Sequence, residues 1–301
     1  MCESGALFFS IVIPSYNRGK FIGETISSLI NQTFRDFEII IIDDGSTDDT
    51  REVITQLHQK DVRVKYFYKE NGERGAARNY GIDKAKGKYI TFIDSDDIAY
   101  PFAFETAFTQ LQLLNCPSCF VVSHEIRFKE NGDTIGRVNT VANINQEILK
   151  GNLLSCIGVF LKSEVLRQYR FDEDRKFSGS EDWLLWLKIA AKYNYFHHDR
   201  ICYCMYQHHD RSVMNYREED LIYRAKHLRT KLYEDELFLK TYGEKSIIRI
   251  YAHMLTYASL HLAMSGKKTA AIRYWINALF TGTSEIFSRR TLGILKNLIT
   301  N

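Results

Sequence analysis

The chain has 301 residues, of which 45% are hydrophobic and 26% are charged, and this composition excludes a disordered or collagen-like protein. Its formal net charge of +3 is too small to favour a nucleic-acid partner. The sequence has no apolar run of the roughly 18–20 residues that cross a bilayer, and its start lacks the pattern of a signal peptide. We therefore expect a cytoplasmic protein with a large, well-ordered core.

Short apolar runs alternate with helical patterns in the first third of the chain. This alternation predicts strands over 8–14, 37–42, 62–68 and 88–93, and helices over 20–31, 48–58 and 74–85. Strands that alternate with helices favour a parallel sheet covered on both faces, so the predicted fold class is α/β. In such folds, ligands bind at the carboxyl ends of the strands.

The rest of the chain is less regular at first and then becomes helical. Its patterns predict helices over 102–114 and 181–193, strands over 119–128 and 195–206, and a hairpin turn at residues 131–132. From about residue 217 onward the pattern is helical, with breaks expected near Gly243, Gly266 and Gly282. We place a domain boundary near residue 216.

Two adjacent carboxylates, Asp43 and Asp44, follow the second expected strand directly. A tight turn and a helix cap explain the segment 45–49 that comes after them. A turn does not explain two carboxylates at the end of a buried strand. We therefore predict that they belong to a site at the carboxyl edge of the sheet.

A second acidic cluster, Asp94-Ser95-Asp96-Asp97, follows the fourth expected strand. Carboxylates this close repel one another, and Mg²⁺ or Mn²⁺ relieves such repulsion, typically with one or two carboxylates and phosphate oxygens as ligands. The alternative is a solvated loop that caps the next helix. We favour a metal site because the cluster lies at the same predicted edge as Asp44.

A third acidic cluster, Ser180-Glu181-Asp182, opens the helix expected from residue 181. Helix capping by Ser180 and the favourable position of acids in a first turn explain this cluster in structural terms. The functional interpretation is that one carboxylate projects into a cleft as a general base.

The six cysteines allow two interpretations. Cys116 and Cys119 have the spacing of a redox or zinc motif, and Cys202 and Cys204 lie near histidines. Because most of these cysteines lie in apolar runs, we favour buried structural thiols that stay reduced.

The order of these motifs resembles the family 2 glycosyltransferases, which have a GT-A type fold. The resemblance is carried by residues 12–18 (VIPSYNR), 28–34 (SLINQTF), 37–47 (FEIIIIDDGST), 75–79 (GAARN), 87–97 (GKYITFIDSDD) and 181–182 (ED). It implies a GT-A nucleotide-binding fold with a mostly parallel central sheet and a C-terminal helical region. Residues 1–105 would form its nucleotide-sugar-binding half, residues 106–216 its acceptor-binding half, and residues 217–301 a helical extension.

The same resemblance implies roles for individual residues. The residues that would contact the nucleotide or its diphosphate are Pro14, Ser15, Tyr16, Asp44, Arg74, Arg78, Asp94 and Ser95. Asp96 would bind the metal together with His209 of a His-x-x-Ser element, and Asp182 would be the catalytic base. The alternatives are that His209 is a surface histidine and that Arg74 and Arg78 are solvated helix residues.

The function implied by the resemblance is that of a metal-dependent inverting glycosyltransferase of the hexosyltransferase type. It would move one sugar from a nucleotide-sugar, most often a UDP-sugar, to a hydroxyl of a glycan or lipid-linked acceptor in surface polysaccharide or glycoconjugate synthesis. The cofactor would be a divalent cation, Mn²⁺ or Mg²⁺. Two alternatives stay open, namely a non-catalytic nucleotide-sugar-binding module of the same fold and a nucleotidyltransferase, although the chain lacks an early Gly-rich phosphate loop.

Basic residues interleave with apolar ones in the C-terminal helical segment, among them Lys267, Lys268 and Arg273. One interpretation is peripheral contact with the inner face of a membrane or with a lipid-linked acceptor. The other interpretation, which the mixed charge of the segment favours, is a solvated helical bundle that packs on the catalytic domain.

Overall fold

Residues 7–59, 61–138, 141–208, 217–282 and 289–300 of the protein are described by the computed structural model. The chain forms two compact units. The first unit comprises Met1–Ile144, Leu153–Ser178 and Tyr193–Arg211, and the second comprises Asn145–Asn152, Gly179–Lys192 and Ser212–Asn301. The second unit therefore takes two short segments from the middle of the chain in addition to the C-terminal helices.

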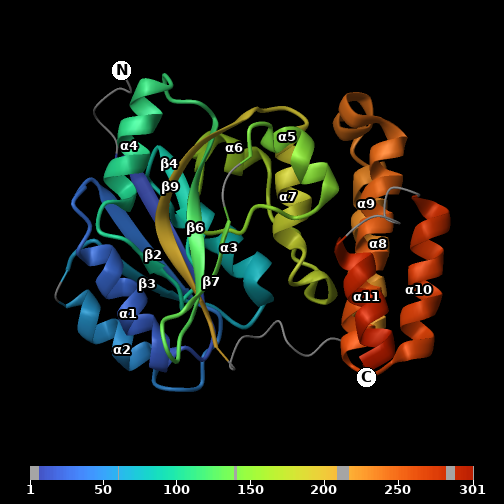
Figure 1. Ribbon diagram of the computed structural model, residues 1–301. Helices are drawn as coiled ribbons and strands as arrows, with labels where there is room; N and C mark the ends of the chain where they lie inside the picture. The colour runs from blue at the N-terminus through green and yellow to red at the C-terminus, as the bar shows by residue number, and fades with distance from the viewer. Residues whose placement is uncertain (1–6, 60, 139–140, 209–216, 283–288, 301) are drawn as a thin grey trace. The chain divides into compact units, whose positions relative to one another are not determined.

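The first unit is built on one nine-stranded sheet (Figure 1). Its strands are β1 (Phe9–Ser15), β2 (Phe37–Asp43), β3 (Val64–Tyr68), β4 (Tyr89–Phe92), β5 (Ile98–Ala99), β6 (Cys119–Phe128), β7 (Thr134–Val138), β8 (Val159–Lys162) and β9 (Tyr195–Gln207). Their order in space is β3-β2-β1-β4-β8-β6-β9-β5, and β7 pairs with β6.

The parallel strands predicted from the first third of the sequence are confirmed. Strand β1 pairs in parallel with β2 and with β4, and β2 pairs in parallel with β3. Strand β8 then joins β4 in the antiparallel sense, and β6 and β7 form the antiparallel hairpin expected around residues 131–132. The whole sheet is therefore mixed, and besides the parallel N-terminal strands β6 pairs in parallel with β9.

Helices cover both faces of the parallel part of the sheet. The helices of the first unit are α1 (Gly19–Ile30), α2 (Thr50–His58), α3 (Glu73–Lys84), α4 (Ala103–Leu113), α6 (Ser163–Gln168) and the 3₁₀ turn η2 (Arg175–Phe177). Alternate side chains of β1, among them Phe9 and Ile11, lie in one buried cluster with residues of α1 and α4. On the other face, α3 approaches so closely that a Cβ atom on Gly81 would lie 2.3 Å from Cγ1 of Val12.

This topology places several chain segments at one edge of the sheet. Residues Ser15 of β1 and Asp43 of β2 are paired in register, and β4 runs parallel to β1 on its other side. The carboxyl ends of adjacent parallel strands lie at the same edge of a sheet. The acidic segments after β2 and β4 are therefore brought together as the sequence predicts.

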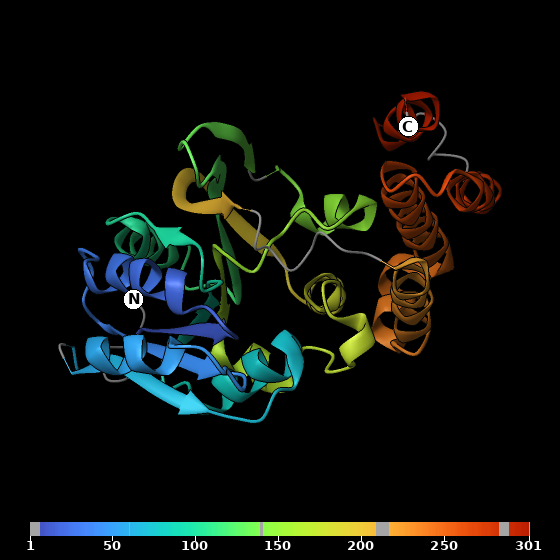
Figure 2. The same cartoon turned by 90° about the horizontal axis from the view of Figure 1, so that it is seen from below.

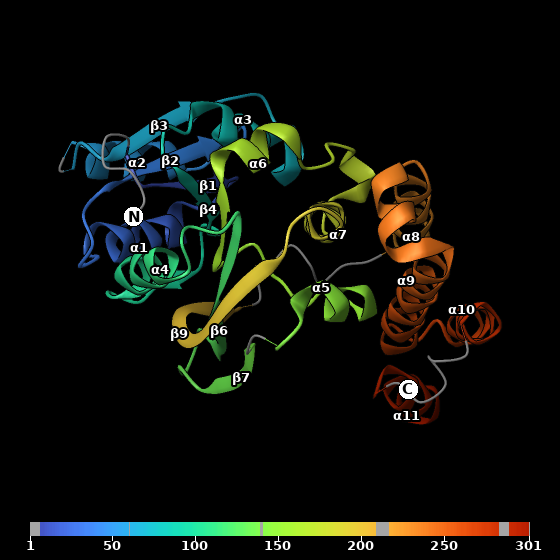
Figure 3. The ribbon, with the colours of Figure 1, turned by 90° about the horizontal axis from the view of Figure 1, so that it is seen from above.

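The second unit is helical. Its elements are the C-terminal part of α5 (Ile144–Glu147), the 3₁₀ turn η1 (Ile148–Lys150), α7 (Glu181–Ala190), α8 (Glu218–Tyr233), α9 (Glu236–Met264), α10 (Lys268–Thr281) and α11 (Arg289–Thr300). Helices α8, α10 and α11 pack on α9 (Figures 2 and 3). The expected break near Gly243 is a kink inside α9, where this glycine has a φ of 72°. The breaks near Gly266 and Gly282 separate helices as predicted.

Four of the cysteines are structural thiols. Cys119, Cys156, Cys202 and Cys204 are buried and free. Burial raises the pKa of the Cys202 and Cys204 thiols to about 11, which keeps them protonated and unreactive at neutral pH. Cys116 takes part in a disulfide, so the expectation that the cysteines stay reduced is wrong for this residue.

Within the described residues, none of the helices combines the length and the apolar composition that a membrane span requires. The assignment of residues 1–105 and 106–216 to donor and acceptor binding concerns their roles and stays a prediction. The same holds for the extension over 217–301.

Candidate functional site

The end of β1 contributes a buried hydroxyl to the edge of the sheet. Ser15 is 2% exposed, and its Oγ atom has no hydrogen-bond partner among the described residues. Its backbone oxygen accepts a hydrogen bond from the backbone nitrogen of Asp44 at 2.8 Å. Pro14 is half-buried, and Tyr16, the next residue, is 48% exposed. A buried hydroxyl without a partner is unusual in a folded protein and is suited to a ligand.

Asp44 is fixed by the segment between β3 and α3. One of its carboxylate oxygens, Oδ1, accepts hydrogen bonds from Nζ of Lys69 at 2.7 Å and from the backbone nitrogen of Gly72 at 2.9 Å. The side chain of Asn71 donates to the backbone oxygen of Asp44 at 2.9 Å. The Asp44 carboxylate is therefore buried but paired, and its position is set by three residues that the sequence analysis did not single out.

The neighbouring carboxylate, Asp43, has a structural role. Its Oδ1 atom accepts from the backbone nitrogen of Ser46 at 2.8 Å, and its Oδ2 atom accepts from the Tyr66 hydroxyl at 2.7 Å. Burial and the Asp43 carboxylate raise the pKa of Tyr66 well above its usual range, so the tyrosine remains a donor. Asp43 thus shapes the turn, and of the two carboxylates Asp44 stays the predicted site residue.

Arg78 joins α3 to the end of β4. Its Nη2 atom lies 2.9 Å from Oδ1 of Asp94, and the exposed fractions of the two side chains are 3% and 33%. The guanidinium also lies 5.4 Å from the centre of the Phe171 ring. The alternative that Arg78 is a solvated helix residue is therefore wrong. Arg74 lies one turn earlier on α3, half-buried and on the same face of the helix.

Asp96 is paired with a histidine that the sequence analysis did not assign to the site. The Nε2 atom of His208 lies 3.0 Å from Oδ2 of Asp96, and both side chains are nearly buried, with 5% and 7% exposed. The His208 ring stacks on Phe21, with 4.5 Å between the ring centres. Nε of Arg18 lies 3.9 Å from the same oxygen of Asp96. His209, the predicted metal ligand, lies outside the described residues.

The donor set at this edge fits a hard divalent cation. Asp94 and Asp96 offer carboxylate oxygens, which Mg²⁺ and Mn²⁺ prefer, whereas Asp97 is bound to the backbone nitrogen of Tyr206 at 3.1 Å. Ser95, between the two carboxylates, is 5% exposed. In the part of the chain that the structure describes, no three His, Cys, Asp or Glu side chains are grouped to hold a metal ion. A cation here would therefore need further ligands, such as the phosphate oxygens of a nucleotide.

Asp182 lies in the first turn of α7, in the second unit. Its Oδ2 atom accepts a hydrogen bond from Nδ2 of Asn152 at 3.1 Å, and its Oδ1 atom accepts from the backbone nitrogen of Trp183 at 2.7 Å. Glu181 beside it is 2% exposed and accepts from the backbone nitrogen of Gly179 at 2.5 Å. Of the two acids, Glu181 is buried and bonded to the backbone just before the helix, and Asp182 is the half-exposed one.

The C-terminal helices support the segment that carries Asn152. Nε1 of Trp183 donates to the backbone oxygen of Ile148 at 2.9 Å, and a Cβ atom on Gly151 would lie 2.9 Å from the ring of His253 in α9. Nη1 of Arg290 in α11 lies 2.5 Å from Nε2 of His253. Burial, together with this guanidinium, lowers the pKa of His253 to about 3. The neutral His253 ring therefore packs against Gly151, the residue before Asn152.

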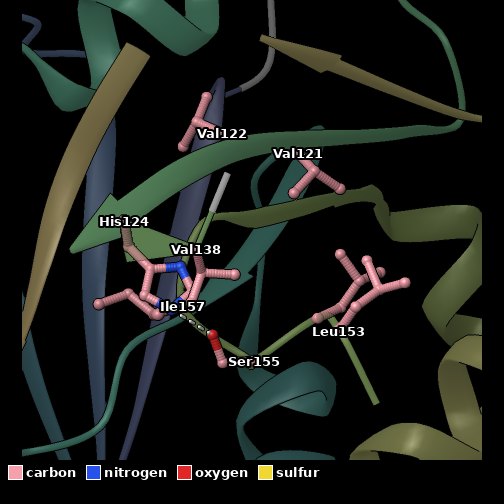
Figure 4. A pocket seen from close by; sticks show the side chains of 8 residues that line it. Val121, Val122, His124, Val138, Leu153, Ser155 and Ile157 are labelled. Carbon is pink, nitrogen blue, oxygen red and sulfur yellow. Dashed lines mark hydrogen bonds between the residues drawn. The ribbon is translucent and has the colours of Figure 1, made fainter. Parts of the chain in front are cut away.

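A separate pocket in the first unit is mostly apolar (Figure 4). It is lined by residues of β6, β7 and the segment before β8, namely Val121, Val122, His124, Val138, Leu153, Leu154, Ser155 and Ile157. Its polar pair is His124 and Ser155, whose Nε2 and Oγ atoms are 3.1 Å apart. A lining without permanent positive charge is poorly suited to a diphosphate.

The comparison with protein families assigns the chain to a family. The family described as "Glycosyl transferase family 2" matches residues 10–170, which include most of β1, the Asp44 segment, α3 and the Asp94–Asp97 cluster. The chain belongs to glycosyl transferase family 2. The predicted resemblance is thereby confirmed.

Two relatives are named as a glycosyltransferase and a glucosyltransferase. An uncharacterized glycosyltransferase of Rickettsia conorii is 38% identical over 188 residues, which are 61% of this chain and 30% of the relative. The GalNAc(5)-diNAcBac-PP-undecaprenol beta-1,3-glucosyltransferase of Campylobacter jejuni is 32% identical over 197 residues, 63% of this chain and 62% of the relative. The match thus spans less than two thirds of the length of either relative.

Solved structures agree with the GT-A fold predicted for this family 2 chain. The structure of S. aureus TarS 1–349 in complex with UDP-GlcNAc covers 97% of this chain and 88% of that one, with a TM-score of 0.74 and 20% identity. The mannosyltransferase PcManGT from Pyrobaculum calidifontis, in complex with GDP-Man and Mn²⁺, covers 98% of this chain and 85% of that one, with a TM-score of 0.57 and 16% identity. These likenesses extend over the C-terminal helical region as well.

Proposed function

We propose that this protein transfers one sugar from a nucleotide-sugar, a UDP-sugar, to a hydroxyl of a glycan or lipid-linked acceptor. The observation that carries the proposal is the set of side chains gathered at one edge of the sheet. Asp44, the Arg78–Asp94 pair and the Asp96–His208 pair come from separate elements and converge there. This edge combines the buried carboxylates of Asp44 and Asp96, the buried guanidinium of Arg78 and the hydroxyl of Ser15. Together these groups suit a nucleoside diphosphate.

In the proposed complex the nucleoside lies against Ser15 and Tyr16. The unpaired Ser15 hydroxyl and the fixed carboxylate of Asp44 supply polar contacts for the ribose and the base. Arg74 and Arg78, one turn apart on α3, supply positive charge for the diphosphate or the base. Lys69 keeps the Asp44 carboxylate in place, so that this carboxylate and the nucleobase can form a hydrogen bond without rearrangement.

We propose that Asp96, with Asp94 beside it, holds a divalent cation, Mn²⁺ or Mg²⁺, when the donor is bound. When bound, such an ion would supply positive charge for the diphosphate of the leaving group. His208 and Arg18 both contact Oδ2 of Asp96, and these contacts fix the orientation of the Asp96 carboxylate. His209 remains a proposed additional ligand.

The proposed catalytic base is Asp182. It removes the proton of the acceptor hydroxyl while the oxygen of that hydroxyl attacks the anomeric carbon of the sugar. The bond from this carbon to the diphosphate oxygen breaks, and its electron pair leaves with the nucleoside diphosphate. A single displacement of this kind inverts the anomeric configuration. The half-exposed carboxylate of Asp182 suits this role better than the buried Glu181.

The proposed acceptor class draws on the Campylobacter jejuni relative, whose name describes a glucosyltransferase for an undecaprenol-linked glycan. The choice of uridine is supported by the family resemblance and by the solved TarS complex with UDP-GlcNAc. The PcManGT complex holds GDP-Man and Mn²⁺, so guanosine is the competing donor base that a test must include.

Thermal unfolding with added nucleotides tests the proposed donor and metal site. We expect UDP with Mn²⁺ to raise the apparent stability of the protein, by about 2.7 kcal/mol at 100 times the Kd, and GDP to act much more weakly. Asp96→Ala should abolish this gain, and the matched variant Glu52→Ala, at an exposed position of α2, should keep it. An equal gain in Asp96→Ala would remove Asp96 from the metal site, and no gain with any nucleotide would contradict the proposed function.

A further inference from the structure

Positive charge is concentrated at the C-terminal end of the sequence. Residues 265–301 contain six Lys or Arg residues and one acidic residue, which gives this stretch a net charge of +5. The remaining 34 basic and 36 acidic residues give the rest of the chain a net charge of −2. The small positive charge of the whole protein therefore originates in α10 and α11 and the residues around them.

Helix α10 exposes a row of apolar side chains. Ile272, Ile276 and Phe280 are 41%, 44% and 88% exposed. Their spacing of four residues places them on one face of the helix. The opposite face of α10 already supplies the core of the bundle through Ala271 and Ala278, which are fully buried. The exposed row is thus not needed to hold the bundle together.

Helix α11 repeats this arrangement. Leu292, Leu295 and Ile299 are 69%, 39% and 83% exposed, and their spacing of three and four residues puts them on one face. Ile294, on another face, is fully buried. Lys296 is exposed and lies one turn from both Leu292 and Ile299. The apolar row on α11 is therefore flanked by a basic side chain.

The two helices lie against each other and against α9. Nε1 of Trp275 in α10 lies 3.4 Å from Oγ1 of Thr291 in α11. Figures 2 and 3 show both helices packed on α9. Lys267, at the start of α10, is exposed as well. Two neighbouring amphipathic helices with exposed apolar rows and excess positive charge have the composition of interfacial membrane helices.

We propose that α10 and α11 dock on an anionic lipid surface. The apolar rows would enter the boundary between headgroups and acyl chains, and Lys267, Lys268 and Lys296 would lie at the level of the negative headgroups. Charge complementarity distinguishes this occupant from a second copy of the chain, because two copies would bring two positively charged stretches together. The inference goes beyond the proposed function, since it concerns the association of the protein with a lipid surface and not the reaction.

Co-sedimentation with lipid vesicles tests the proposal without any donor or acceptor. We expect the protein to bind vesicles of phosphatidylcholine with phosphatidylglycerol, to bind pure phosphatidylcholine much more weakly, and to lose affinity as salt is added. The double variant Phe280→Glu/Ile299→Glu should bind the anionic vesicles at least about tenfold more weakly, because two deeply inserted side chains become charged. Lys267→Glu/Lys268→Glu should weaken binding and reduce its salt dependence.

Leu113→Glu is the matched control, because Leu113 is 70% exposed on α4 and lies outside the proposed surface. It should bind vesicles as the unchanged protein does. Equal binding by all variants, or no vesicle binding by the unchanged protein, would overturn the proposal. Self-association that Phe280→Glu/Ile299→Glu abolishes, without vesicle binding, would assign the face to a second copy. Nucleotide-induced stabilisation of the same samples reports on the donor site separately, since none of the substituted positions belongs to the proposed donor site.

Discussion

Substitution of Asn152 by aspartate tests the proposed role of Asp182 most specifically. Nδ2 of Asn152 donates to Oδ2 of Asp182 at 3.1 Å. Asn152→Asp keeps the shape of the side chain, but it replaces a hydrogen-bond donor with a second negative charge. Like charges at this separation favour the protonated form, so the pKa of Asp182 should rise.

The size of the change follows from the exposure of the two groups. Two unit charges about 4 Å apart interact by about 1 kcal/mol in water and by about 4 kcal/mol at an effective dielectric constant of 20. Because Asn152 is exposed and Asp182 is half-exposed, the lower value applies. About 1 kcal/mol corresponds to a rise of somewhat less than one unit in the pKa of Asp182. Loss of the hydrogen bond from Nδ2 of Asn152 raises this pKa further.

The measurement is the pH dependence of kcat/KM for sugar transfer. We expect the acidic limb of the profile to move upward by about one pH unit in Asn152→Asp and by less in Asn152→Ala. Asn277→Asp, at an exposed position of α10 in the same unit, adds the same charge and should leave the limb in place. An unmoved acidic limb in Asn152→Asp would refute the assignment of Asp182 as the group whose ionisation controls the reaction.

Three further predictions concern stability. Gly81→Ala should lower the free energy of unfolding by about 1–3 kcal/mol, because the new Cβ would lie 2.3 Å from a β1 side chain. Gly23→Ala should raise the free energy of unfolding by about 0.5–1 kcal/mol, because its new Cβ would have an ordinary 3.6 Å contact. Urea unfolding measures both changes. Lys69→Met should lower it by about 1–3 kcal/mol and weaken UDP binding in calorimetry, because the buried Asp44 carboxylate loses a charged partner at 2.7 Å. Burial lowers the pKa of His253 to about 3, so between pH 6.5 and 3 the unfolded chain takes up a proton that the folded protein does not bind. The free energy of unfolding should therefore fall by up to about 1.4 kcal/mol per pH unit as the pH drops through that range, and His253→Gln should remove this dependence. Equal stability of the two glycine variants, no loss of stability in Lys69→Met, or an unchanged pH dependence in His253→Gln would each contradict the corresponding argument.

The sequence predicts the parallel part of the fold well because β1, β2 and β4 are buried on both faces. The run FEIIII at 37–42 has Glu38 as its single polar residue, and β2 occupies Phe37–Asp43. The antiparallel additions were harder to predict. Strand β8 is four residues long and β7 is largely exposed, so neither carries a distinctive period in its side chains. Their places in the sheet depend on pairing with residues far away in the chain.

The residues of the candidate site also fall into those that the local sequence predicts and those that only the three-dimensional fold brings together. Asp44 follows β2 directly and Asp96 lies in the acidic cluster soon after β4, so both are predictable at the edge of the sheet. His208 was missed because the motif spacing pointed to His209, and the contact of His208 with Asp96 depends on the pairing of β9 with β6 and β5. Asn152 was missed because it lies in a polar segment without periodicity, and its contact with Asp182 spans 30 residues. Contacts of this kind depend on the three-dimensional fold rather than on local sequence.

Release of nucleoside diphosphate from a panel of UDP- and GDP-sugars tests the central claim most directly. The protein, Asp182→Asn and Asp96→Ala are each incubated with the panel and Mn²⁺, in the presence and absence of lipid-linked acceptor, and donor binding is measured on the same samples. The account predicts acceptor-dependent release from one UDP-sugar, release reduced by orders of magnitude in Asp182→Asn with donor binding intact, and loss of both in Asp96→Ala. Undiminished release by Asp182→Asn, or a protein that binds none of the donors, would contradict it.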